Sequence, residues 1–440
     1  MAWKKIKLKE ILKQYRITHT IQNNSTYRQV TISQTGKVTY RGEKKGSEIG
    51  RKRQFIIDLE KYPNTLIFIR QGILKGGIGI ATSEVDKCVV TENMPMFEIV
   101  NIEPEFLEFF IKSPIFKDKI EKLVPTGTAQ KALHEKTLLE EEFYLPTSIE
   151  EQQKTTKFVK KVLNEHIELQ SDFEEQLLLL KKLRERILQE AVSGELVEQN
   201  PQDEPASILL EKIKKEKEEL IKEKKIKKDA LLKEIEEDEI PYALPNGWEW
   251  VRMQEVFDVR DGTHDTPKYV KEGIPLITSK NLYNGKLDLN NVKYIHQNDH
   301  IEISKRSNVE KFDILFGMIG SIGNPVLVDI EPNFSIKNVA LFKYYNIILS
   351  NPKFLKYFLD SVITHMNNNS SGAVQSFVSL KYLRNYLFPL PPLEEQKRIV
   401  AKVDELMQFC DELEQEIQSS LQYSLALMQS VLREAFKEEE

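Results

Sequence analysis

The strongest constraint on the fold is that the chain repeats itself at an offset of 244–245 residues. Three pairs of segments match in the same order: residues 3–12 with 248–257, Gly127-x-x-Gln130 with Gly372-x-x-Gln375, and residues 187–191 with 431–435. The 440 residues are enough for two or three domains. The sequence therefore predicts two copies of one folding unit.

Each copy ends in a long segment with a heptad pattern. In the first, the predicted seam positions are Val159, Val162, His166, Leu169, Phe173, Gln176, Leu180, Leu183 and Ile187. In the second they are Val403, Leu406, Cys410, Leu413, Ile417, Ser420, Ser424, Leu427 and Val431. An apolar seam this narrow indicates a helix that packs on another helix. We expect two helices of about 60 Å, at ~1.5 Å per residue, that pair antiparallel with one globular domain at each end.

The ends of these segments carry typical helix-boundary residues. The run 147–151, Thr-Ser-Ile-Glu-Glu, can form a capping box at the start of the first helix. Pro391-Pro392 is expected to start the second helix, and Gly194 can end the first. His166 and Cys410 lie at seam positions, so we interpret them as packing residues and not as metal ligands or nucleophiles.

A linker separates the two copies. Pro201 and Pro205 precede a Lys/Glu-rich stretch from Leu209 to Glu237 that has strong helical propensity, and Pro245-Asn-Gly247 should follow its end. The predicted segments are residues 1–146 (first globular domain), 147–198 (first long helix), 199–244 (helical linker), 245–390 (second globular domain) and 391–440 (second long helix).

The net charge of −5 conceals an uneven distribution. Residues 1–75 hold 17 Lys+Arg against 5 Asp+Glu, a balance of +12. A local excess of this size suits a surface that contacts phosphates. Any single lysine cluster is more simply a solvated surface, and only its combination with other features favours nucleic acid.

Cysteine and histidine usage argues against two kinds of site. Cys88 and Cys410 have no C-x-x-C spacing, and the seven histidines are scattered, so neither a disulfide framework nor a zinc site is predicted. The N-terminal run MAWKKIKLKE lacks the apolar stretch of a signal peptide, and no run approaches 18 apolar residues. We therefore expect a cytoplasmic protein.

Six further stretches form a recognisable set. They are residues 204–213, 216–221, Leu244-Pro-Asn-Gly-Trp-Glu-Trp-Val251, Asp261-Gly-Thr-His-Asp-Thr-Pro267, Gly273-Ile-Pro-Leu-Ile277 and Leu390-Pro-Pro-Leu-Glu-Glu-Gln-Lys-Arg398. Through these six stretches, the chain resembles the specificity (S) subunits of type I restriction-modification systems across essentially its whole length. The resemblance implies an α+β fold, with two pseudo-repeated target-recognition domains of mixed α/β structure separated by two long antiparallel coiled-coil helices. Each domain would read one half of a bipartite DNA site.

The resemblance also implies partners. These are double-stranded DNA, two modification subunits that methylate adenine N6 with S-adenosylmethionine, and restriction subunits that translocate and cleave DNA. S-adenosylmethionine, ATP and Mg are then expected on those subunits, while this chain is expected to hold no cofactor or metal and to contact no membrane. The first globular domain lacks a Gly-Thr-His-Asp-Thr-Pro element, so the family pattern says less about its contacts.

No catalytic motif makes the chain an enzyme by itself. An adenine methyltransferase holds its flipped base with a short Asn/Asp-Pro-Pro-aromatic loop, and Asn351-Pro-Lys-Phe354 lacks the second proline. We interpret this run and its counterpart Glu103-Pro104 as helix starts. Glycines at 76–79 and 317–323 occupy equivalent places and fit neither a P-loop nor a dinucleotide fingerprint, so they are predicted to be turns that could lie near phosphate.

Candidate DNA contacts are chosen by chemistry, because Arg and Lys suit guanine and phosphates while Asn and Gln suit adenine. In the first domain they are Arg41, Lys44, Lys45, Arg51, Lys52, Arg53, Arg70, Gln71 and Lys75. In the second they are Thr263, His264, Thr266, Lys268, Tyr269, Ser279, Lys280 and Asn281. Gln130 and Gln375 either touch DNA or close a loop. His264 suits a DNA contact and a loop-stabilising hydrogen bond equally.

Two other classes of function stay open from the residues alone. A scaffold protein could use the coiled coil to join two globular domains without binding DNA, and basic loops argue against it. An enzyme role for one of the units needs a pair of titratable groups at a suitable spacing, and no pair is convincing.

Overall fold

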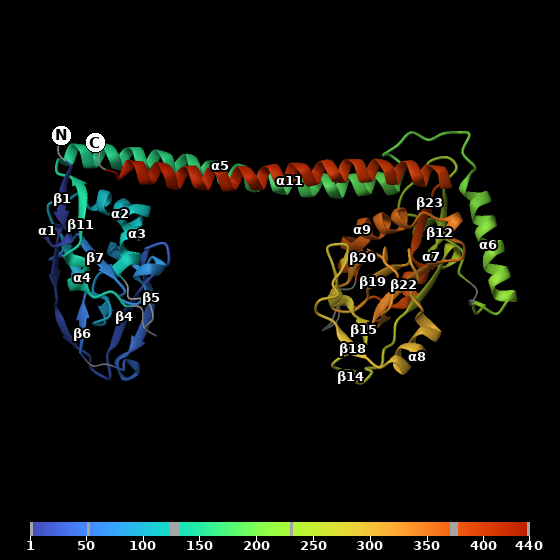
Figure 1. Ribbon diagram of the computed structural model, residues 1–440, viewed down its shortest axis with the longest axis horizontal. Coiled ribbons are helices and arrows are strands. Elements are labelled where there is room, and N and C mark those ends of the chain that lie inside the picture. The colour runs from blue at the N-terminus through green and yellow to red at the C-terminus, as the bar shows by residue number, and fades with distance from the viewer. Residues whose placement is uncertain (1–2, 51–52, 124–131, 229–231, 370–376, 438–440) are drawn as a thin grey trace. The chain divides into compact units, whose positions relative to one another are not determined.

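The computed structural model describes residues 3–50, 53–123, 132–228, 232–369 and 377–437. The chain divides into two compact units, one formed by residues 1–175 with 416–440 and the other by residues 176–415. Each unit contains a globular part and a portion of both long helices (Figure 1).

The two globular parts share one β scaffold. In the first, β1 (Trp3–Lys7) pairs antiparallel with β11 (Glu142–Pro146), and a four-stranded sheet has the order β2-β10-β7-β8. In the second, β12 (Glu249–Arg252) pairs with β23 (Leu387–Leu390), and the sheet has the order β13-β22-β19-β20. The sheet strands are β2 Leu12–Tyr15, β7 Thr65–Phe68, β8 Ile78–Ile80, β10 Met96–Ile99, β13 Phe257–Asp261, β19 Ile314–Gly317, β20 Gly323–Leu327 and β22 Val339–Tyr344. The predicted repeat is thereby confirmed as a repeat of structure.

Helices complete the repeated scaffold. A single turn links the first two strands in each copy, as α1 (Leu8–Ile11) and α7 (Met253–Val256), and a short helix precedes the last strand, as α4 (Glu135–Leu139) and α10 (Leu380–Asn385). The longer helices are α2 (Pro104–Lys112), α3 (Pro114–Leu123) and α9 (Pro352–Asn369). Prolines thus begin α2 and α9, and Asn351 Oδ1 accepts the Lys353 N–H at 3.1 Å, which confirms the interpretation of both runs as helix starts.

Aromatic side chains fill the core of the first globular part. Phe106 and Phe110 of α2 are fully buried, and the Phe110 ring lies 5.1 Å from that of Phe143 in β11. Burying one phenylalanine side chain contributes roughly 1.5–3 kcal/mol. The second part repeats this arrangement, since Phe358 of α9 lies 4.9 Å from Phe388 of β23.

The remaining strands differ between the two copies. The first globular part carries a five-stranded sheet of order β3-β6-β9-β4-β5, and the second carries a four-stranded sheet of order β14-β18-β15-β21 with a separate hairpin, β16-β17. Their bounds are β3 Thr18–Thr20, β4 Thr26–Ile32, β5 Val38–Lys45, β6 Arg53–Ile56, β9 Val89–Val90, β14 Tyr269–Val270, β15 Ile274–Ile277, β16 Leu282–Tyr283, β17 Lys286–Leu287, β18 Lys293–Ile295 and β21 Ser335–Ile336. A common scaffold therefore supports two unlike additions.

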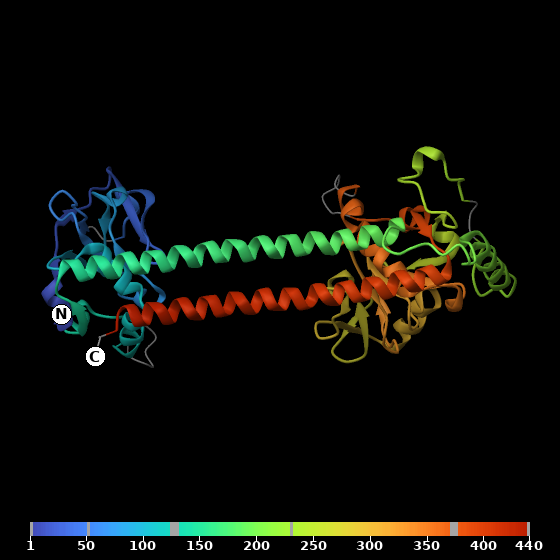
Figure 2. The same cartoon turned by 90° about the horizontal axis from the view of Figure 1, so that it is seen from above.

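The two long helices are α5 (Ile149–Ser193) and α11 (Leu393–Ala435), and they run alongside each other within each unit (Figure 2). In the first unit His166 Nδ1 lies 3.0 Å from Ser424 Oγ. In the second unit Arg184 donates to Asp411 at 2.6 Å. Lower residue numbers on one helix face higher numbers on the other, so the pairing is antiparallel, as predicted.

Most of the predicted seam positions are buried or partly buried, and five are exposed, namely Leu169, Gln176, Leu183, Ser420 and Leu427. Val159, His166 and Leu180 are buried, but Leu169 and Leu183 are 46% and 43% exposed. Residues 177 and 184 on α5 are partly buried where the predicted Gln176 and Leu183 are exposed, and residues 421 and 428 on α11 are partly buried where Ser420 and Leu427 are exposed. At these positions the residue that packs is the one after the predicted residue, because the partner helix selects the register.

Both predicted boundaries of α5 are confirmed. Ser148 Oγ accepts the Glu151 N–H at 3.1 Å, which is the N-cap half of a capping box. Gly194 has φ +80° directly after the helix, and a Cβ there would lie 2.4 Å from Pro245 Cγ. Only glycine therefore suits this close approach between the end of α5 and the start of the second globular part.

The linker helix is shorter than predicted. It is α6 (Ala206–Lys222), and the described residues between 223 and 236 contain no further helix, where the sequence predicted one as far as Glu237. Lys224 adopts φ +59°, and its N–H donates to Ile221 while Lys225 N–H donates to Leu220. These two bonds form a Schellman motif, which stops a helix whatever the propensity of the residues that follow.

Candidate DNA interface

The loop that follows β13 is held down by backbone hydrogen bonds. The N–H of Gly262 donates to Val339 at 2.9 Å, and that of Thr263 donates to Ile336 at 3.0 Å. A Cβ at position 262 would lie only 2.3 Å from the Ile336 carbonyl oxygen. Glycine thus lets the loop 262–268 lie directly against the segment 336–339, although 70 residues or so separate them in sequence.

A hollow of about 300 Å³ opens beside this loop. Four predicted contacts line it, namely Tyr269, Ser279, Lys280 and Asn281. Lys293, Lys337 and Asn338 line it too, and the sequence did not single them out. With Ile319 also in its lining, the hollow brings together residues from five separate stretches of the second unit.

Among the described residues, the three lysines around the hollow have no carboxylate partner. In the part of the chain that the structure describes, no carboxylate oxygen lies within 4.0 Å of the ammonium groups of Lys280, Lys293 or Lys337. Lys293 Nζ lies 4.3 Å from the centre of the Tyr269 ring, and Lys337 donates to Thr266 Oγ1. Positive charge without internal compensation is what a phosphate-contacting surface requires.

His264 shares the carboxylate of Asp261 with a cation, Arg306, that no sequence pattern indicated. Its Nε2 lies 2.8 Å from Asp261 Oδ2, and its Nδ1 lies 3.0 Å from Asn338 Oδ1. The other Asp261 oxygen accepts a hydrogen bond from Arg306, at the end of α8 (Gln297–Ser307). Arg306 lies 45 residues from Asp261, so no local pattern could have linked them.

Three predicted contacts are engaged inside the protein. Asn281 is 4% exposed, and its amide group donates to the Asp288 and Asn291 carbonyls, while Ser279, 5% exposed, donates to Asn338. In the first unit, Arg70 forms a two-point ion pair with Glu135, with N···O distances of 2.6 and 2.9 Å. The three side chains are therefore bonded to other groups of the protein itself.

Other predicted contacts of the first unit are exposed. Arg41, Lys44 and Lys45 lie on β5, and Gln71 and Lys75 lie on the turn between β7 and β8. The β4–β5 pairing shifts register between Gln29 and Val30, which leaves Arg41 as the extra residue of a β-bulge. Bulges redirect side chains and frequently do so at functional surfaces.

Some predicted contacts cannot be placed. Arg51, Lys52, Gln130 and Gln375 lie outside the described residues, as does the side chain of Arg53. Thr263 is partly buried, while Thr266 and Lys268 are exposed on the loop that follows β13. The predicted turns at Gly76 and Gly320 are confirmed, since both have positive φ in the hairpins β7–β8 and β19–β20.

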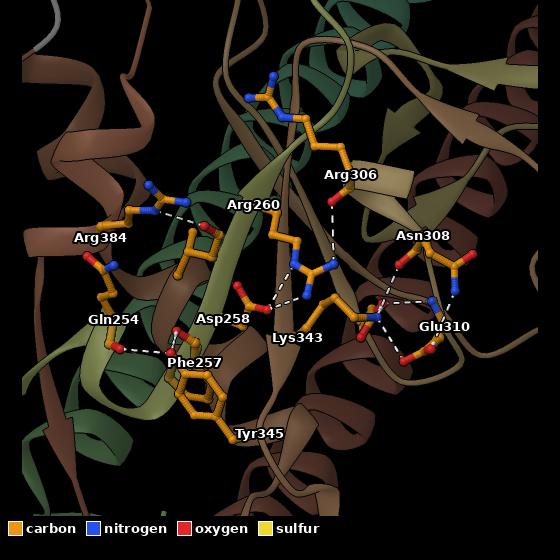
Figure 3. A network of polar contacts seen from close by, with 12 residues as sticks. Gln254, Phe257, Asp258, Arg260, Arg306, Asn308, Glu310, Lys343, Tyr345 and Arg384 are labelled. Carbon is orange, nitrogen blue, oxygen red and sulfur yellow. Dashed lines mark hydrogen bonds and ion pairs between the residues drawn. The ribbon is translucent and has the colours of Figure 1, made fainter. Parts of the chain in front are cut away.

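A polar network anchors α8 to the scaffold (Figure 3). Lys343 of β22 donates to the Asn308 carbonyl at 3.1 Å and to Glu310 at 2.9 Å. Arg260 forms a two-point contact with Asp258 and also donates to the Arg306 carbonyl at 3.4 Å. The Arg306 guanidinium points away from Arg260 in Figure 3, so this network fixes its backbone and leaves its side chain to Asp261.

The described residues contain no group of three or more His, Cys, Asp or Glu side chains arranged to hold a metal ion. Nor does any helix within them combine the length and apolar character that crossing a bilayer requires.

Comparison with known families matches residues 245–423 to the type I restriction modification DNA specificity domain. The chain is 36% identical over 255 residues to the type I restriction enzyme EcoAI specificity subunit of Escherichia coli, covering 56% of this chain and 43% of that protein. It is 36% identical over 270 residues to the EcoEI specificity subunit of the same species, covering 58% and 43%. The matches thus span less than half the length of these relatives.

Solved structures share the fold. A chain from a structure of a type I R-M system is 18% identical with a TM-score of 0.66, covering 99% of this chain and 97% of that one. The HsdS subunit of Thermoanaerobacter tengcongensis is 19% identical with a TM-score of 0.56, covering 99% and 96%. Residues 245–423 therefore belong to the type I restriction modification DNA specificity domain family, and the whole chain shares the fold of these solved structures.

Proposed function

We propose that this protein is the sequence-specific DNA-recognition subunit of a type I restriction-modification complex and is not catalytic alone. Each globular part would read one half of a bipartite site. The observation that carries the proposal is the duplicated scaffold with unlike additions, because two readers on one framework suit a site of two unlike halves. The uncompensated lysines around the hollow favour DNA over a purely structural role.

The partners follow from the proposed role. Two modification subunits would bring S-adenosylmethionine and methylate adenine, and restriction subunits would bring ATP and Mg and cleave DNA. The assembly would work on double-stranded DNA in the cytoplasm. Among the predicted contacts, the exposed ones are proposed to meet DNA: Arg41, Lys44, Lys45, Gln71, Lys75, His264, Thr266, Lys268, Tyr269 and Lys280.

Methylation mapping tests this function directly. The chain and its modification subunit are produced in a host that lacks adenine methylation, and the modified bases are located by sequencing. We expect methylated adenines at one bipartite motif, and no methylation when either protein is absent. Methyl transfer by the highly purified chain alone, or methylation without a motif, would contradict the proposal.

Exchanging residues 1–146 for the equivalent domain of another specificity subunit should change one half of the motif only. The reason is that the first globular part has its own core and its own additional sheet. Motif mapping of the chimaera measures the outcome, with an exchange of residues 245–390 as the reciprocal control. A simultaneous change in both halves would disprove one reader per half-site.

Adding one heptad to both long helices, after Phe173 and after Ile417, should lengthen the preferred spacer of the motif by two or three base pairs. Seven residues at ~1.5 Å add roughly 10 Å, which is about three base pairs at ~3.4 Å each. The half-site bases should stay the same, although the extra base pairs also rotate one half-site and weaken binding. As a control, a heptad added to α5 alone misaligns the seam and should abolish activity. An active double insertion that keeps the original spacer would assign the distance to the partner subunits.

A further inference from the structure

Asp261 has a buried carboxylate with two exposed partners. Its side chain is 5% exposed, whereas those of His264 and Arg306 are 57% and 58% exposed. Its Oδ2 lies 2.8 Å from His264 Nε2, and its Oδ1 accepts from the Arg306 guanidinium. Burying a carboxylate is costly unless it is paired, so the contact holds both partners in place.

The two partners come from different elements. His264 stands on the loop that follows β13, and Arg306 stands in the last turn of α8. A guanidinium has five N–H donors, and the described structure engages Arg306 through one nitrogen only. Most of its donors therefore face outward, beside a ring whose other nitrogen lies 3.0 Å from Asn338.

The surroundings favour an anion here. Lys337 donates to Thr266, which lies in the same loop as His264. Asn338 contacts His264 and also lines the hollow. The planar Arg306 guanidinium suits the oxygens of a phosphate diester, which accept hydrogen bonds and carry one negative charge. Both His264 ring nitrogens lie within hydrogen-bonding distance of Asp261 and Asn338, so His264 supports the carboxylate and leaves the phosphate to Arg306. Each Asp261 oxygen has one of its two partners, and the Asp261 side chain is 5% exposed.

We propose that Asp261 is a positioning residue that, with His264 supporting the same carboxylate, sets the Arg306 guanidinium as a clamp on one backbone phosphate of the DNA. The inference rests on the proposed function, since it takes the ligand to be DNA. When side chains are held in place before binding, the entropic cost of ordering them no longer opposes binding. A supporting carboxylate can hold them without touching the ligand itself.

The sign of one charge change tests the clamp. Asp261→Asn removes a negative charge close to the proposed DNA surface, and long-range electrostatics alone would strengthen DNA binding. The clamp predicts the opposite, a several-fold weaker binding with a log–log salt slope flatter by about one, because one phosphate contact is lost. The matched control is Asp265→Asn, which removes the same charge from an exposed neighbour in the same loop and should leave binding unchanged or slightly tighter.

Binding is measured for the full chain assembled with its modification subunit, on duplexes with and without the mapped motif, and thermal unfolding checks that each variant is folded. Arg306→Gln should weaken binding as Asp261→Asn does, and the double variant should be no weaker than either single one. This pair keeps the test valid if Asp261→Asn alone disturbs the loop. The clamp would be overturned if Asp261→Asn or Arg306→Gln bound DNA with wild-type affinity, or if the losses were additive in the double variant. The proposed function would stay intact in that case, provided that the wild type binds the motif. If the wild type binds no motif, the proposed function fails first.

Discussion

Replacing Lys343 with methionine should lower the free energy of unfolding of the second globular part by about 3–5 kcal/mol, the usual cost of breaking a buried ion pair. The Lys343 side chain is 10% exposed, and its Nζ lies 2.7 Å from Asp313 Oδ2. The Asp313 side chain is only 4% exposed, so methionine would leave that carboxylate buried without its cation. Methionine preserves the length and apolar stem of lysine, which separates the lost charge from lost packing.

Lys353→Met is the matched control, because Lys353 pairs with Asp404 at 2.6 Å on the surface of the same unit, with side chains 50% and 38% exposed. An exposed pair of this kind contributes about 0–1 kcal/mol. Adding Asp313→Asn to Lys343→Met should recover most of the lost stability, because no buried charge then remains. Hydrogen exchange of the β19 and β22 amides measures each variant. Equal losses for Lys343→Met and Lys353→Met would show that the buried pair contributes nothing special.

The loss should also depend on pH. Burial raises the pKa of Asp313 to about 6, against the opposing effect of Lys343, whereas its ordinary value is 3.8. A folded-state pKa above the unfolded one means that the folded protein takes up the proton more readily, so this group costs stability as the pH rises from about 4 through 6. Without the ammonium the pKa rises further. The deficit of Lys343→Met should therefore be smaller at pH 5 than at pH 8, and a deficit that does not change with pH would refute this assignment.

Replacing Phe436 with alanine should destabilise the first globular part by about 3–5 kcal/mol, as is typical of a buried phenylalanine. Phe436 is 2% exposed and follows the last turn of α11. Its ring lies 5.5 Å from that of Phe106 and 5.7 Å from that of Phe110, both in α2. Phe436 thus completes the core of the first globular part, although it lies more than 300 residues from α2 in the sequence.

Tyr423→Ala supplies the control on the same helix and in the same unit, because Tyr423 is 76% exposed and should change the stability by no more than about 0.5 kcal/mol. Hydrogen exchange of the β7 and β10 amides reports on the first part, and that of β19 and β22 on the second. Loss of protection in β7 and β10 alone is the expected pattern for Phe436→Ala. Unchanged protection there would mean that the α11 terminus adds nothing to that core.

Local chemistry made several elements predictable from the sequence. The proline starts of α2 and α9, the Ser148 cap and the Gly194 stop all depend on residues a few positions apart. The mixed helix and strand fold and the two long helices agree with the family resemblance. Helical propensity predicted the wrong structure after α6, because the left-handed turn at Lys224 ends the helix there.

The sequence by itself determined that one scaffold is built twice and that each copy ends in a long helix, because these features follow from spacing along the chain. Only the tertiary structure decided that Arg184 contacts α11 while the neighbouring Leu183 is 43% exposed, since Arg184 pairs with Asp411 of that helix. It also decided that Asp261 holds Arg306 and that Phe436 closes the first core. Such contacts join residues far apart in sequence, and they exist only after the sheets and helices have packed.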